Sequence, residues 1–91
     1  MKECYVKIFG VVQGVFFRQS TKELADQLGV LGWVKNCNDG SVEATFIGNL
    51  KQIEQMLSWA NQGSVNASVE KVVMISEKDC TKPPESFTIL Y

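Results

Sequence analysis

The chain has 91 residues, of which 45% are hydrophobic, and its formal net charge at pH 7 is −1. We expect a single domain over residues 1–91, because this length supports one packed core and no more. The charge argues against a nucleic-acid partner bound by bulk electrostatics, since such domains are clearly basic. No apolar run approaches the roughly 18 residues of a membrane span, and the N-terminus lacks the apolar segment of a secretory signal.

Cysteine and histidine usage narrows the chemistry further. Three cysteines (Cys4, Cys37 and Cys80) lie far apart, and there is no histidine. An odd number of cysteines without a paired spacing is typical of a reducing compartment, so we expect a cytoplasmic protein. Zinc is not expected, because no two cysteines are spaced as ligands. Without histidine, any catalysis has to proceed without an imidazole acid or base.

The chain begins with the pattern of a strand, a glycine loop and a helix. Alternating apolar and polar residues predict a strand over 3–11. A stripe of apolar residues at helical spacing predicts a helix over 17–28, which Gly29 ends. Ser20 with Glu23 offers a later start in the form of a capping box, but Phe17 lies on the same stripe and favours the earlier one.

The second part of the chain predicts a hairpin, a second helix and two more strands. Asn49, followed three residues later by Gln52, is typical of a capping box at a helix start. Leu50 and Ile53 open the apolar stripe of that helix. The expected elements are a strand over 31–37, a tight turn at 38–40, a strand over 42–47, a helix from Asn49 to Gly63, a strand over 67–76 and a short strand over 87–91.

This order is β-α-β-β-α-β with a short additional strand, which predicts a ferredoxin-like α/β sandwich: two helices on one face of a mostly antiparallel sheet. The strands at 3–11 and 31–37 are separated by one helix and should run parallel. Their C-terminal ends then share one edge of the sheet. That edge carries the loop 13–18 and Asn36, and it is where ligands tend to bind in α/β architectures.

The loop after the first strand is a candidate phosphate site. Gly14 permits a strained turn, backbone amides of residues 14–18 can converge on an anion at the helix start, and Arg18 offers a planar fork of donors. Read alone, the loop is as consistent with a simple turn and a solvated Arg18. No Gly-Lys-Ser/Thr follows, so a magnesium-nucleotide site is not implied. The candidate phosphate-binding residues are Gln13, Gly14, Val15, Phe16, Phe17 and Arg18.

Asn36, at the end of the second expected strand, is the other candidate. Its amide carries both a donor and an acceptor, so it can hold a water molecule although it cannot act as a base. Judged alone, Asn36 and Asn38 are more typical of side chains that stabilise a turn.

Taken together, the two stretches resemble the signatures of acylphosphatases. The first is Ile8-x-Gly10-x-Val12-Gln13-Gly14-Val15-x-Phe17-Arg18, and the second is Gly32-Trp33-Val34-Lys35-Asn36 with Gly40, Val42 and Gly48 downstream. The resemblance covers nearly the whole chain. It implies hydrolysis of acyl phosphates to a carboxylate and inorganic phosphate without a metal or cofactor. Arg18 would be the catalytic arginine that binds phosphate, and Asn36 would orient the attacking water.

Two departures from the family pattern stand out. Ser64 follows Gly63 where many members have proline, and we expect this to affect only a connection away from the site. Cys37 follows Asn36 where threonine or an aliphatic residue is more usual. A different function of the same fold, a non-catalytic phosphate-binding sensor, is the alternative. In either case we expect a monomer with a small-molecule ligand and with neither a nucleic acid nor a membrane as partner.

The chemistry implied by the resemblance agrees with the lack of histidine. An acyl phosphate loses a carboxylate whose conjugate acid has a pKa of about 4–5, so the leaving group departs without a proton. Phosphoryl transfer through a loose transition state needs mainly positioning and charge stabilisation. Unactivated phosphate monoesters, which need an acid, are disfavoured as substrates.

Overall fold

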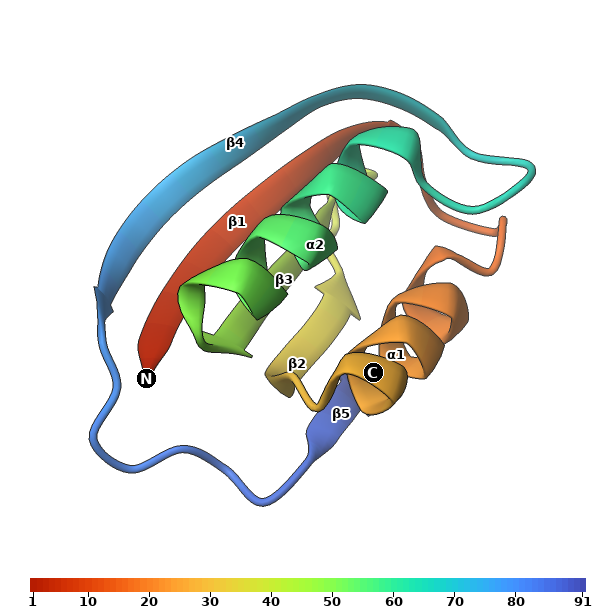
Figure 1. Ribbon diagram of the computed structural model, residues 1–91. Helices are drawn as coiled ribbons and strands as arrows, with labels where there is room; N and C mark the ends of the chain where they lie inside the picture. The colour runs from red at the N-terminus through yellow and green to blue at the C-terminus, as the bar shows by residue number, and fades with distance from the viewer.

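A computed structural model describes residues 1–91 as two helices packed on one face of a five-stranded sheet (Figure 1). The predicted ferredoxin-like arrangement is confirmed. Neither helix has the length and the apolar composition of a membrane-spanning segment. The elements are β1 (Lys2–Val11), α1 (Phe17–Leu28), β2 (Leu31–Asn36), β3 (Val42–Gly48), α2 (Leu50–Gln62), β4 (Ser68–Asp79) and β5 (Phe87–Leu90).

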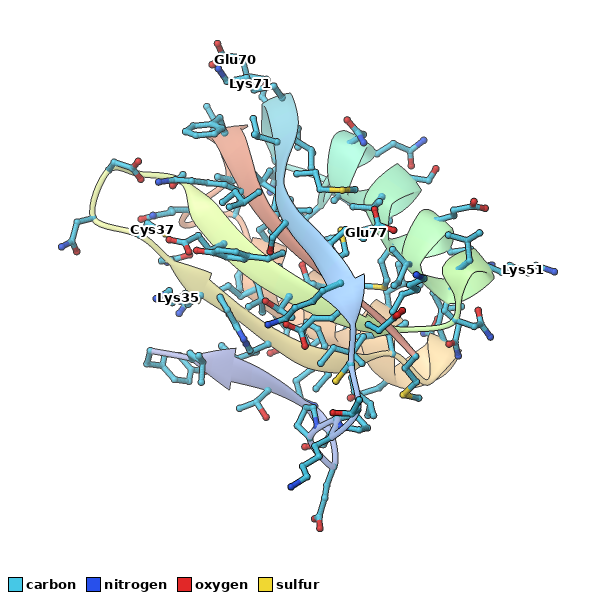
Figure 2. All side chains as sticks on the ribbon, turned by 90° about the vertical axis from the view of Figure 1, so that its left-hand side faces the viewer. Lys35, Cys37, Lys51, Glu70, Lys71 and Glu77 are labelled. Atoms are coloured by element: carbon cyan, nitrogen blue, oxygen red, sulfur yellow. The ribbon has the colours of Figure 1, made fainter.

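The strand order in the sheet is β4-β1-β3-β2-β5. Strands β1 and β2 both pair antiparallel with β3, so they run in the same direction and end at the same edge, as predicted. Strand β5 pairs parallel with β2, and Figure 2 shows the arrowheads of these two strands pointing to the same side. Three strand ends therefore meet at one edge of the sheet.

Both helices begin and end close to where the sequence predicts. Helix α1 takes the earlier of its two possible starts, and Gly29 ends it. Helix α2 starts with the predicted capping box: the backbone N–H of Gln52 donates to Asn49 Oδ1, and the backbone N–H of Asn49 donates to Gln52 Oε1. The Gln52 side chain also donates to the carbonyl of Leu28 at 2.7 Å. Gln52 thus caps the start of α2 and also binds a backbone carbonyl in the last turn of α1.

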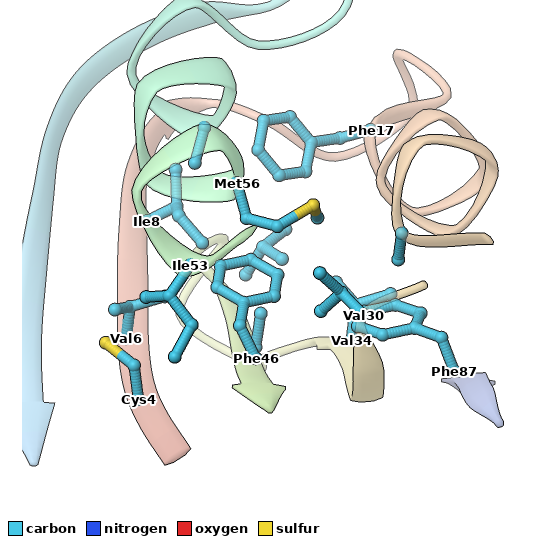
Figure 3. Packing of buried hydrophobic residues seen from close by; sticks show 14 of the residues in the cluster. Cys4, Val6, Ile8, Phe17, Val30, Val34, Phe46, Ile53, Met56 and Phe87 are labelled. Atoms are coloured by element: carbon cyan, nitrogen blue, oxygen red, sulfur yellow. The ribbon is translucent and has the colours of Figure 1, made fainter. Parts of the chain in front are cut away.

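The core lies between the helices and the inner face of the sheet (Figure 3). Phe46 of β3 and Phe87 of β5 stack with ring centroids 6.2 Å apart, and Phe17 of α1 packs against Trp59 of α2 at 5.0 Å. Met56 fills the space between them and is fully buried. Each large apolar side chain buried here contributes about 1.5–3 kcal/mol, so this core fixes the sheet edge that carries the site.

Some details differ from the sequence-based expectations. Leu50 is 59% exposed, so the buried stripe of α2 begins at Ile53. Strand β4 extends to Asp79 because it pairs with β1 as far as Lys2. Thr45 is buried on the open face of the sheet, where alternation suggests exposure. Thr45 lies on the central strand β3 and pairs with Tyr5 of β1 and with Trp33 of β2, whose ring centroids are 5.8 Å apart.

Gly32 of β2 is a position at which no side chain fits. Its φ of 129° is rare for any residue with a Cβ. A Cβ built there would lie 1.9 Å from the carbonyl oxygen of Thr45 on the neighbouring strand. The close approach of β2 to β3 therefore requires glycine.

Candidate functional site

A cavity of about 310 Å³ opens at the edge where β1, β2 and β5 end. Arg18 and Asn36, the two predicted catalytic residues, both line it although they lie far apart in the chain. Of the other candidates, Gly14, Phe16 and Phe17 line the cavity, whereas Gln13 and Val15 do not. The complete lining is Val12, Gly14, Phe16, Phe17, Arg18, Gln19, Asn36, Ile89 and Tyr91.

The start of α1 faces this cavity without a side-chain cap. Its N-cap residue is Phe16, which has φ 60° and ψ 25° and makes no capping hydrogen bond, and the first turn has no acidic residue. Gly14 also has a positive φ, 73°. Left-handed residues in a loop turn successive backbone N–H groups towards a common point. The uncapped N–H groups and the positive end of the helix dipole together favour an anion.

Phe16 is the one non-glycine residue with a positive φ, and it does not bury its ring. The side chain is 77% exposed at the rim of the cavity. A left-handed conformation costs a residue with a Cβ about 1–2 kcal/mol, and burial does not offset this cost here. Such uncompensated strain is typical of functional loops.

Arg18, in the first turn of α1, is positioned by the C-terminal strand. Its Nη1 donates to the carbonyl of Leu90 at 3.4 Å, and its guanidinium carbon lies 5.0 Å from the ring centroid of Tyr91. One edge of the guanidinium thus faces the end of β5. Its remaining N–H groups are free to meet an anion in the cavity.

Asn36 presents the most unusual polar atom of the site. Its side-chain oxygen is buried and has no hydrogen-bond partner in the protein. A buried acceptor without a partner costs about 1–3 kcal/mol, so native proteins rarely keep one without a use. Asn36 also lines the cavity, so this amide with an unused acceptor belongs to the cavity wall.

Two side chains hold the loop between β1 and α1 from outside the cavity. Gln13 Nε2 donates to the carbonyls of Cys37 at 2.7 Å and Ser41 at 2.8 Å. Ser64 Oγ, on the connection between α2 and β4, donates to the carbonyl of Val15 at 2.7 Å. The expectation that the departure at Ser64 lies away from the site is therefore wrong: this serine contacts the candidate phosphate loop.

Ile89 and Tyr91 belong to the cavity but are missing from the sequence-based candidates. Strand β5 brings them there by pairing in parallel with β2, a contact that no local pattern encodes. Cys37, in contrast, points away from the cavity: its thiol donates to Glu43 Oε1 at 2.9 Å, and Figure 2 shows it beyond the end of β2. No cavity-lining side chain is a carboxylate, an imidazole or a thiol.

The fold and the site together define a ferredoxin-like α/β sandwich with an arginine and uncapped backbone amides at one sheet edge. A family model, acylphosphatase, matches residues 4–89. The chain belongs to the acylphosphatase family.

Individual relatives agree with this assignment. The chain is 45% identical over 85 residues to an acylphosphatase of Yersinia pseudotuberculosis, with 92% of this chain and 90% of the relative covered. It is 42% identical over 91 residues to an acylphosphatase of Roseiflexus, covering 100% and 97%. The crystal structure of an acylphosphatase from Bacillus subtilis superposes with a TM-score of 0.94 at 30% identity, with both chains covered completely.

Proposed function

We propose that this protein hydrolyses acyl phosphates to a carboxylate and inorganic phosphate. Its membership of the acylphosphatase family supports this activity. The single observation that supports the mechanism is that Asn36, whose buried Oδ1 has no hydrogen-bond partner in the protein, lines the same cavity as Arg18. The side-chain oxygen of Asn36 on β2 can accept a hydrogen bond from the attacking water, and the guanidinium of Arg18 on α1 can bind the phosphoryl group.

The phosphate is held by Arg18 and by backbone amides of the loop 13–18. The uncapped start of α1 supports this role, because its N–H groups lack side-chain partners. The guanidinium binds phosphate oxygens through paired N–H donors, and the loop amides bind the others. These donors stabilise the charge that spreads over the equatorial oxygens in the transition state.

The attacking water is held by Asn36, whose Oδ1 accepts one of its hydrogens. Attack occurs in line with the bond to the carboxylate, so that the oxygen–phosphorus bond forms as the phosphorus–oxygen bond to the acyl group breaks. With no carboxylate, imidazole or thiol side chain in the lining, the other proton of the water passes to a phosphate oxygen. The products are a carboxylate and inorganic phosphate.

The substrate is restricted by the weak proton donors of the site, because the lining has no carboxyl or imidazole side chain and its only hydroxyl is the phenol of Tyr91. A carboxylate leaves without protonation, because its conjugate acid has a pKa of about 4–5. An alkoxide leaving group needs a general acid, so phosphate monoesters react far more slowly. The apolar part of the cavity, including Phe16 and Ile89, is the surface available to the acyl group.

The test is hydrolysis of benzoyl phosphate in the presence of a metal chelator, with benzyl phosphate as a matched monoester. We expect turnover of the first substrate, unchanged by chelator, and little of the second. Equal rates on both substrates, or loss of activity with chelator, would contradict the mechanism. Binding of inorganic phosphate without any turnover would instead favour the non-catalytic sensor.

We also propose that the protein acts in the cytoplasm as a single-domain monomer. Three free cysteines, of which Cys4 is buried, suit a reducing cytoplasm. One hydrophobic cluster spanning both helices and the sheet supports one domain over residues 1–91. The net charge of −1 supports the absence of a nucleic-acid partner, and we expect the domain to act as a monomer. Sedimentation equilibrium at micromolar concentration tests the monomer.

A further inference from the structure

The side chain of Gln13 makes two hydrogen bonds, and the proposed mechanism gives it no role. It was a candidate phosphate ligand, but it does not line the cavity. Both hydrogens of its side-chain amide are already used, one on the carbonyl of Cys37 and one on the carbonyl of Ser41. An amide nitrogen carries two hydrogens, so this side chain has no donor left for phosphate.

The two acceptors lie at the base of the β2–β3 turn. The N–H of Cys37 donates to the carbonyl of Ser41 at 2.8 Å, and the N–H of Gly40 donates to the carbonyl of Cys37 at 3.2 Å. The Gln13 amide therefore contacts both sides of the turn at the point where the strands separate. Cys37 directly follows Asn36 along the chain.

We infer that Gln13 is a positioning residue that sets Asn36, and with it the attacking water, at its working distance from the bound phosphate. This inference rests on the proposed function. The connection is short: Gly14 of the phosphate loop, then Gln13, then one hydrogen bond to the carbonyl of Cys37, then Asn36. No other side chain bonds the loop 13–18 to the β2–β3 turn.

The loop has a second, separate support. Ser64 holds the carbonyl of Val15 from the opposite side, and the N–H of Ser20 donates to the carbonyl of Phe16 at 3.0 Å. Loss of the Gln13 contacts therefore leaves the phosphate loop held by these bonds, and it removes the side-chain contact between that loop and the turn that directly follows Asn36. Phosphate affinity should persist and the rate of the chemical step should fall, because misplacement of about 1 Å can cost 10²-fold in rate.

Gln13→Glu tests this with a side chain of the same shape. Near neutral pH the carboxylate has no hydrogen to donate and faces two carbonyl oxygens. We expect kcat on benzoyl phosphate to fall roughly 10- to 10²-fold, with inhibition by inorganic phosphate changed less than about threefold. On acidification, the carboxyl gains one donor and restores one contact, so the deficit relative to wild type should shrink near pH 4.

Two further variants make the test specific. Gln13→Met removes both donors at every pH, so its deficit should stay constant over the same range. Gln55→Glu, on the exposed side of α2, makes the same charge change far from the turn and should match wild type throughout. Thermal unfolding of each variant shows that it is folded under the assay conditions.

The outcomes separate this inference from the proposed function. If wild type fails to hydrolyse benzoyl phosphate, the proposed function falls, whatever the variants do. If wild type is active and Gln13→Glu has a kcat within twofold of it at pH 7, the positioning role is wrong. A deficit that appears in phosphate affinity rather than in kcat, or one that does not shrink at low pH, also overturns it.

Discussion

The two helices of this protein start in opposite ways. The start of α2 is closed by reciprocal hydrogen bonds between Asn49 and Gln52, and it lies away from the cavity. The start of α1 has a strained Phe16 in place of a cap, makes no side-chain hydrogen bond and faces the cavity. The same backbone groups are thus satisfied by the protein itself in one helix and left for a ligand in the other. A missing cap is informative because the chain can clearly build one.

The largest expected effect comes from removing the cation beside the open helix start. Arg18→Ala should lower kcat/KM on benzoyl phosphate by roughly 10³-fold or more, as for other arginines that stabilise phosphoryl transfer. It should also abolish the stabilisation by inorganic phosphate, which amounts to about 2.7 kcal/mol at 100 times Kd. Arg18→Lys should recover little, since an ammonium does not replace the planar fork. Phosphate-dependent melting of the Arg18→Ala variant would contradict this role.

The next effect concerns the other side of the cavity. Asn36→Ala removes the acceptor for the water but leaves the phosphate donors in place, so kcat should fall about 10²-fold. Stabilisation by phosphate should persist, in contrast to Arg18→Ala. Steady-state kinetics combined with phosphate titration by calorimetry measures both quantities. Full activity of the Asn36→Ala variant would rule out the water-positioning role.

A change at the capped start of α2 should lower the stability of the protein and leave its activity unchanged. Asn49→Ala removes the cap of α2 and should lower the free energy of unfolding by about 1 kcal/mol, with kcat and KM unchanged. Urea unfolding and the benzoyl phosphate assay give the two readouts. Lys51→Ala, at an exposed position of the same turn, serves as the control and should change neither. Loss of activity in the Asn49 variant would remove the distinction between the two helix starts.

The smallest expected effect concerns the β2–β3 turn. Its polar groups, like those at the start of α2, find their hydrogen-bond partners within the protein. The hydroxyl and N–H of Ser41, together with the ammonium of Lys7, hold the pKa of Asp39 well below its usual range. A lowered pKa contributes stability that is present above the unfolded value of about 3.9 and is lost as the pH falls through the folded value. Asp39→Asn should therefore be slightly less stable than wild type at pH 7, and this difference should shrink as the pH is lowered to 2. Urea midpoints at the two pH values measure it.

The sequence predicts most of what is local in this structure. Gly29 after an apolar stripe, and Asn49 with Gln52, place both helices to within a residue, because stripes and caps depend on neighbours in the chain. The proximity of Arg18 to Asn36 follows from strand direction alone.

What the sequence does not show is pairing between distant segments. Tyr91 reaches the cavity through the parallel pairing of β5 with β2, and Ser64 reaches the loop through the packing of α2. The unpartnered oxygen of Asn36 is likewise visible only in three dimensions, because the same residue at a strand end is more often a turn former.

Gly32 affects how mutational data on this protein should be interpreted. It belongs to the same signature as Asn36, yet it does not line the cavity and instead allows β2 to approach the carbonyl of Thr45. A saturation screen scored on activity alone would rank substitutions at Gly32 with those at Arg18 and Asn36. A screen that also scores cellular abundance would separate them, since Gly32 variants would be depleted as protein while Arg18 and Asn36 variants would accumulate normally but stay inactive.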